Sequence, residues 1–246
     1  MFVGTEGDSV QPVLRRLNAL RRLSEAGVSA IKMAVRHRIL KAAAREDLVR
    51  EGDRPDSVRV LLSGWAFRYR ILVDGRRQIV NFILPGDSCD AHIYLFSRLD
   101  YSIATLTPVV YCELDRESFE QLVSSDRSVA EAFYCETLAA NSIQREWTIN
   151  LGRRDALERV AHLICELYER LRTVGLVDKD TFFLPATQTD LADATGLSTV
   201  HLNRTLQELR GSGLITLKDR NLTIHDFQAL SNTAMFNPNY LHLDRK

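Results

Sequence analysis

Five short runs rich in β-branched and aromatic residues constrain the first half of this chain most strongly. They span residues 58–62, 65–71, 78–84, 101–106 and 109–114. Turn residues separate them, and Asp74-Gly75 between the second and third runs is a strong hairpin signal. Many short antiparallel strands at this spacing are typical of a small β-barrel or jelly roll.

Helical patterns lie on both sides of these runs. We expect an amphipathic helix over residues 12–24, a second over 30–44, and long helices from Arg116 onward. A helix over 155–173 is followed by Gly175, a C-cap candidate, and 181–184 is predicted to be a short strand. The fold class predicted is α+β, with an N-terminal jelly-roll or cupin-like barrel and a helical C-terminal domain. The expected boundaries are 1–126, 127–150 and 151–246, with a hinge at 150–152.

Composition restricts the kinds of partner and site. Lys and Arg total 32 and Asp and Glu total 32, so any attraction to an anionic partner depends on the local placement of charges. The four cysteines form no C-x-x-C pair, which argues against a zinc knuckle or a cysteine-clustered iron–sulfur centre, and no metal site is predicted. There is no signal-peptide pattern and no apolar run of about 18 residues. We therefore expect a cytoplasmic protein without a membrane partner.

The helix predicted over 127–150 carries residues spaced alternately by four and three positions. That spacing is typical of a coiled-coil seam between two copies of a chain, but the helix can also pack on its own barrel. Glu136 within the series counts against a seam. The residues of the candidate dimer seam are Val129, Phe133, Ala140, Ile143 and Trp147.

Residues 187–209 contain two helical patterns joined at a glycine. Thr187, followed three residues later by Asp190, resembles a capping box at a helix N-terminus. Gly196 allows the left-handed backbone of a tight turn, and Ser198 can cap the second helix. This order predicts a helix-turn-helix, whose second helix places its first turns in the major groove of DNA.

Side chains on that second helix suit contacts with base edges. Arg204 can donate two parallel hydrogen bonds to guanine, and Asn203 can pair with adenine. A β-hairpin with its turn at 218–221 follows, and its basic side chains can reach phosphates. We predict a winged helix-turn-helix. Its candidate DNA-binding residues are Thr187, Gln188, Ser198, Thr199, Val200, His201, Asn203, Arg204, Lys218 and Arg220.

Taken together, the two halves resemble the Crp/Fnr family of bacterial transcription regulators. The resemblance rests on residues 47–53 with 61–64, on the turn 84–87, and most specifically on 187–215. It implies a homodimer that binds double-stranded DNA at a near-palindromic operator through the helix 198–210, with RNA polymerase as a further partner. The family's base-contacting positions fall on Thr199, Val200, Asn203 and Arg204. Val200 replaces a residue that is often Glu in the better-known members, which predicts a different operator.

The resemblance also implies an effector pocket after the turn 84–87. Members that bind cyclic nucleotides carry a Gly-Glu pair there and then an Arg for the phosphate, whereas this chain has Asp90-Ala91 and Tyr101. A buried phosphate would lack its charge-assisted partner, so we expect that cyclic AMP is not the effector. No cofactor is predicted; haem stays open, with His37 and His92 as axial candidates by residue type only. The candidate pocket residues are Cys89, Asp90, His92, Tyr101 and Ser102.

Two other classes of function share parts of this pattern. A cupin-type metalloenzyme shares the barrel, but its metal site needs two or three histidines with a carboxylate, and only His92 with Asp90 lies in the right region. No nucleophile, base and orienting residue stand in a recognisable pattern, so no enzyme is predicted. The alternative is a ligand-sensing barrel that acts through protein contacts, with a winged helix that does not bind DNA. DNA binding that weakens as salt increases would favour the DNA-binding regulator over this alternative.

Overall fold

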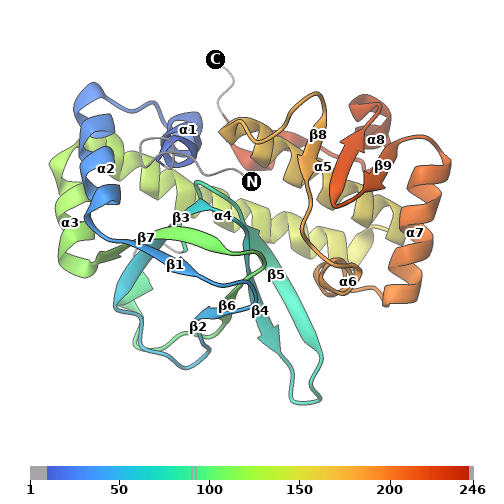
Figure 1. Ribbon diagram of the computed structural model, residues 1–246, viewed down its shortest axis with the longest axis horizontal. Helices are drawn as coiled ribbons and strands as arrows, with labels where there is room; N and C mark the ends of the chain where they lie inside the picture. The colour runs from blue at the N-terminus through green and yellow to red at the C-terminus, as the bar shows by residue number, and fades with distance from the viewer. Residues whose placement is uncertain (1–9, 90, 92, 244–246) are drawn as a thin grey trace.

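The structure is a computed structural model that describes residues 10–89, 91 and 93–243 (Figure 1). The strands of the N-terminal half are β1 (Ile39–Ala42), β2 (Asp47–Val49), β3 (Ser57–Ser63), β4 (Ala66–Ile71), β5 (Arg77–Ile83), β6 (Ser102–Thr105) and β7 (Val109–Asp115). They form two antiparallel sheets, with the orders β1-β7-β3 and β2-β6-β4-β5. Ile83, Ile103 and Val109 are among the buried residues of the barrel core. The predicted jelly-roll barrel is confirmed.

Helices surround this barrel and build the C-terminal half. They are α1 (Gln11–Leu20), α2 (Glu25–His37), α3 (Arg116–Ser125), α4 (Arg127–Arg153), α5 (Ala156–Val174), α6 (Gln188–Thr195), α7 (Thr199–Gly211) and α8 (Phe227–Thr233), with the short 3-10 helices η1 (Ile93–Leu95) and η2 (Pro238–Leu241). Helix α4 runs lengthwise behind the barrel to the C-terminal domain (Figure 1). The chain then turns at Arg154, and Asp155 caps α5 through a capping box.

The C-terminal domain is a winged helix-turn-helix, as predicted. Its sheet contains β8 (Thr181–Phe183), β9 (Ile215–Lys218) and β10 (Asn221–Ile224), in the order β8-β10-β9. The turn between β9 and β10 has positive φ at Asp219 (51°) and Arg220 (62°), the backbone of a type I′ hairpin turn. This turn forms the tip of the wing.

Two predicted helices near the N-terminus were wrong in extent. Helix α1 ends at Leu20, and Ser24 caps α2 by accepting a hydrogen bond from the amide of Gly27. Residues 39–42, predicted as helix, form β1, because they pair along β7. That partner lies about 70 residues away in sequence, so a local helical pattern gives no sign of it. The expected hinge at 150–152 is also absent, since α4 continues to Arg153.

The predicted dimer seam faces the interior of its own subunit, so that prediction was wrong. Val129, Phe133, Ile143 and Trp147 are each at most 5% exposed, and Ala140 is half-buried. Val129 and Phe133 pack with α1 and α2, whereas Ile143 and Trp147 pack with the barrel and α5. The alternating spacing therefore reflects packing within one chain. Glu136, which lies in the same series, is buried among these residues.

One continuous hydrophobic core joins the barrel to the C-terminal domain. Phe67 and Phe82 of the barrel belong to the same cluster as Leu167 of α5 and Leu206 of α7. The winged helix-turn-helix is therefore packed against the barrel. Within the described part of the chain, no helix is long and apolar enough to cross a membrane.

Candidate nucleic-acid interface and effector region

The helix-turn-helix is built from two capped helices, as its sequence predicts. The hydroxyl of Thr187 accepts a hydrogen bond from the amide of Asp190 at 3.2 Å, and the Asp190 carboxylate accepts from the amide of Thr187 at 2.9 Å. Gly196 has φ of 65°, and a Cβ there would lie 3.0 Å from Leu151. The hydroxyl of Ser198 accepts from the amide of His201 at 3.2 Å. The turn and both caps fix the direction in which α7 leaves α6.

The first turns of α7 present their side chains to solvent. Val200 is 72% exposed, and Thr199, His201 and Arg204 are exposed as well, while Asn203 is half-buried. The opposite face of α7 is held by Leu202, Leu206 and Leu209, which are fully or almost fully buried. The predicted DNA-contacting residues on this helix thus lie in its first two turns, where most side chains are accessible.

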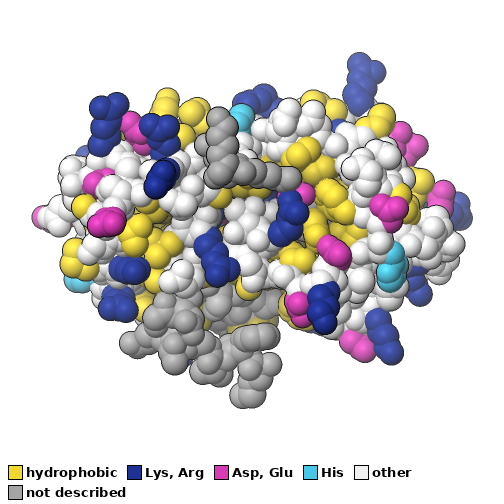
Figure 2. All heavy atoms as spheres, turned by 90° about the horizontal axis from the view of Figure 1, so that it is seen from above, with side chains coloured by type: hydrophobic (Ala, Val, Ile, Leu, Met, Phe, Trp, Pro, Cys, Tyr) yellow, Lys and Arg dark blue, Asp and Glu magenta, His cyan; other side chains and the backbone are white. Residues whose placement is uncertain are grey.

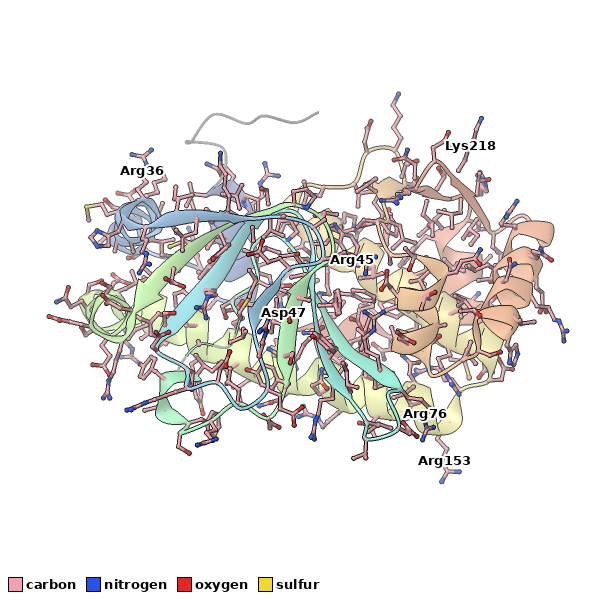
Figure 3. All side chains as sticks on the ribbon, turned by 60° about the horizontal axis from the view of Figure 1, so that its bottom comes forward. Arg36, Arg45, Asp47, Arg76, Arg153 and Lys218 are labelled. Atoms are coloured by element: carbon pink, nitrogen blue, oxygen red, sulfur yellow. The ribbon has the colours of Figure 1, made fainter. Side chains whose placement is uncertain are left out.

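The wing adds basic side chains to the same domain. Lys218 and Arg220 are exposed at the β9–β10 turn, and Figure 3 shows Lys218 pointing away from the body of the molecule. Thr187 and Gln188, at the start of α6, are exposed too. Lys and Arg side chains are interspersed with Asp and Glu over the face drawn in Figure 2. Contact with phosphates therefore depends on these few positions.

The three predicted effector residues that the structure describes have separate surroundings. Cys89 is buried in the barrel core, Tyr101 lies under the guanidinium of Arg68 at 4.5 Å, and Ser102 accepts a hydrogen bond from the amide of Glu51. Asp90 and His92 lie outside the described residues. A polar cavity of about 80 Å³ lies instead between the barrel, α4 and α5. Its lining includes Arg16, Arg68, Asp87, Glu136 and Arg170.

A buried charge network occupies this region, and the sequence patterns did not reveal it. Arg170 of α5 reaches the predicted effector turn, where it donates to Asp87 at 2.7 Å and to the carbonyl of Phe82 at 2.8 Å. Burial alone would lower the pKa of Arg170, but Asp87 and Glu166 raise it overall. On α4, Glu136 accepts from the amide and the hydroxyl of Ser88 at 2.9 and 2.8 Å. Burial raises the pKa of Glu136 to about 7, against the opposing effect of Arg16.

A second ion-pair cluster attaches the helix-turn-helix to the barrel. Asp190 is 1% exposed and accepts two hydrogen bonds from Arg45 at 2.9 and 2.7 Å and one from Arg77 at 2.8 Å. Arg77 also donates to Asp193 at 2.8 Å. Although burial opposes ionisation, the hydrogen bonds from Arg45 and Thr187 hold the pKa of Asp190 well below its ordinary value. Arg45 is labelled in Figure 3 where the barrel meets the C-terminal domain.

The sequence identified only half of this contact. It predicted the role of Asp190 as a capping residue, because that role depends on a neighbour three positions away. Nothing local marks Arg45 and Arg77 as its partners, since they lie 145 and 113 residues away. Within residues 10–89, 91 and 93–243, no group of three or more His, Cys, Asp or Glu side chains is arranged to hold a metal ion. His37 is exposed at the end of α2.

A jelly-roll barrel, a long helix and a capped winged helix-turn-helix with an accessible α7 define a DNA-binding regulator with a sensor-type domain. A cyclic nucleotide-binding domain model matches residues 39–126, and a Crp-like helix-turn-helix model matches residues 158–233. The chain belongs to the Crp/Fnr family of bacterial transcription regulators. It is a DNA-binding regulator of that type.

Individual relatives agree with this assignment. The chain is 29% identical to the transcriptional activator protein FnrL of Cereibacter sphaeroides, over 78% of each chain. It is 30% identical to the transcriptional activatory protein AadR of Rhodopseudomonas palustris, over 76% of this chain and 78% of that protein. Among solved structures, FixK2 from Bradyrhizobium japonicum superimposes with a TM-score of 0.72 at 25% identity, over 80% of this chain and 96% of that one.

Proposed function

We propose that this regulator acts as a two-fold dimer through the solvent-exposed face of α4, here called the α4 stripe. The stripe comprises Tyr134, Leu138, Asn141, Arg145 and Thr148, all exposed and separated by four, three, four and three residues. Tyr134 is 62% exposed and Leu138 is 47% exposed, so two large apolar side chains four residues apart lie uncovered side by side on this face. An Asn within such a seam favours a single register between the two helices.

The dimer would place two α7 helices about one helical turn of DNA apart on a near-palindromic operator. The observation that carries this proposal is the exposure of Thr199, Val200, His201 and Arg204 in the first two turns of a capped helix. Arg204 has the donors for a guanine, whereas Val200 offers only apolar contact, such as with a thymine methyl group. Contact with RNA polymerase, implied by the family resemblance, remains a prediction, as does a cytoplasmic location.

We propose further that cyclic AMP is not the effector. The polar cavity between barrel and α4 measures about 80 Å³, whereas pockets for small molecules span about 300–1,000 Å³. The cationic groups of Arg16 and Arg170 already face Asp87, at 3.3 and 2.7 Å. A cyclic phosphate would have to compete with this carboxylate for both guanidinium groups.

The test combines sedimentation with selection of DNA from a random pool. Two-fold symmetry predicts a dimer at micromolar concentration and a selected site with two inverted half-sites, bound more weakly as salt increases because counterions are released. A wild-type protein that sediments as a monomer would refute the dimer. Absence of salt-dependent selection would favour a domain that acts through protein contacts alone.

A further inference from the structure

The last described residues form a strap, defined here as residues 234–243, which follows α8. It lies beyond residue 233, where the match to the helix-turn-helix model ends. The strap returns from α8 toward the middle of the molecule (Figure 1). It includes η2, which packs against α4 and α5. Leu241 is fully buried, and Phe236 is 8% exposed.

Helix α5 holds the strap in place through aromatic and polar contacts. The hydroxyl of Tyr240 donates a hydrogen bond to the buried carboxylate of Glu166 at 2.9 Å. The ring of Tyr240 stacks on His162, with centroids 5.7 Å apart and an interplanar angle of 20°. Burial, together with Glu166, raises the pKa of Tyr240 well above its ordinary value, so it stays a donor. The strap is therefore a packed part of the domain.

The end of the strap lies along one edge of the α4 stripe. The hydroxyl of Ser142 on α4 lies 3.0 Å from Nε2 of His242. Ser142 and Cys135 each follow a stripe residue by one position, which places them on the same flank of the helix. On the other flank, Gln144 donates to the carbonyl of Val80 in the barrel at 2.7 Å. The α4 stripe is thus bordered by the barrel on one side and by the strap on the other.

A groove of about 410 Å³ opens between the strap and the stripe. Its lining comprises Leu20, Cys135, Leu138, His242 and Leu243. Leu138 belongs both to this groove and to the α4 stripe, so the groove is continuous with the proposed dimer face. In a parallel pair of helices related by a two-fold axis, each stripe residue faces the same region of the partner. The side chains near Tyr134 and Leu138 on α4 of a second copy would therefore lie against this groove.

We propose that the strap forms part of the dimer interface, with its groove receiving apolar side chains from α4 of a second copy of this chain. This inference rests on the proposed function, in which the α4 stripe is the dimer seam. In a single subunit, the mostly apolar lining of the groove and the side chain of Leu138 are exposed to water. A neighbouring helix would bury these apolar surfaces. Because Tyr240 of the strap is hydrogen-bonded to Glu166 of α5, the strap would connect the dimer interface to α5.

The first test compares single substitutions in the full-length protein by sedimentation equilibrium. Leu243→Asp should raise the dimer dissociation constant about tenfold or more, because a carboxylate would enter the apolar groove, and Leu138→Asp should do the same. The matched control is Leu72→Asp, at a leucine that is 49% exposed in the β4–β5 turn, and it should leave the constant unchanged. Unchanged thermal unfolding of the diluted variants would show that their folds are intact.

The outcomes separate this inference from the proposed function. If Leu138→Asp weakens the dimer and Leu243→Asp does not, the strap is not part of the interface while the seam stands. If neither weakens a dimer that does form, both proposals fail.

A second measurement needs no substitution at the interface. Cys135 lines the groove and is half-buried, whereas Cys89, Cys112 and Cys165 are buried. Labelling by N-ethylmaleimide, mapped by mass spectrometry, should slow at Cys135 as protein concentration rises through the dimer dissociation constant. An equal rate in monomer and dimer would overturn the inference.

Discussion

Replacing Glu136 with Gln should stabilise this protein at neutral and alkaline pH, and the gain should disappear in mild acid. Glu136 lies on the inward face of α4, is 6% exposed, and accepts two hydrogen bonds from Ser88. Gln can keep both contacts, because its oxygen accepts from the amide and its NH₂ group donates to the hydroxyl. The substitution therefore removes the buried charge and leaves the geometry in place.

The magnitude follows from the pKa of Glu136, which burial raises from 4.5 to about 7. Between these values the folded protein binds more protons than the unfolded chain, so the free energy of unfolding falls as pH rises from 4.5 to 7. At 1.36 kcal/mol per pH unit, the full difference is about 3 kcal/mol above pH 7. Glu136→Gln should recover up to that amount at pH 8 and less than about 1 kcal/mol at pH 5.

Urea unfolding at pH 5 and pH 8, at one fixed protein concentration, measures both values. Glu117→Gln, at an exposed carboxylate on α3, is the control for loss of a surface charge. The reasoning is refuted if Glu136→Gln changes the free energy of unfolding equally at the two pH values. Such a result would mean that the carboxyl of Glu136 has the same affinity for protons in the folded and unfolded states.

Three further predictions concern the DNA interface, the domain contact and the effector. Arg204→Ala should weaken binding to the selected operator by about 1–3 kcal/mol and binding to random DNA less, as measured by fluorescence anisotropy; equal losses would identify Arg204 as a phosphate contact. Asp190→Asn should lower the free energy of unfolding at pH 7 by about 2–3 kcal/mol, because Arg45 and Arg77 lose a buried anion. The pKa of Asp190 is depressed, so this difference should be present above about pH 4 and shrink below it; a difference that is constant down to pH 2 would contradict the ion-pair account. Calorimetric titration with cyclic AMP should show no binding at micromolar concentration, and binding that Arg98→Ala abolishes would show that the expected pocket was misaligned.

Local sequence patterns predicted correctly those elements whose conformation is set by residues a few positions apart. The turn at Asp74-Gly75, the cap at Ser198 and the left-handed turn at Gly196 all act within a few residues, and each element formed as predicted. The predicted strands of the barrel likewise match β3 to β7. Backbone preferences and alternating hydrophobicity thus specified most of the fold.

Features that depend on distant partners could not be predicted in the same way. Helix α4 carries two series with alternating four- and three-residue spacing, and only the folded barrel shows that Val129, Ile143 and Trp147 face inward while the series through Leu138 faces outward. The same reason explains why the contacts of Arg170 with Asp87 were missed. Spacing identifies a helical face without identifying what covers it.

The buried carboxylate of Asp190 limits how freely this winged helix can be exchanged between proteins. A chimaeric regulator that carried residues 151–246 on a foreign barrel would keep the carboxylate and its cap at Thr187 but lose the guanidinium groups of Arg45 and Arg77. An unpaired buried anion is costly, so such a graft should fold poorly or dock in another orientation unless arginines occur at equivalent positions of the new barrel. A graft that keeps this contact must therefore include Arg45 and Arg77 of the barrel as well as the DNA-binding domain.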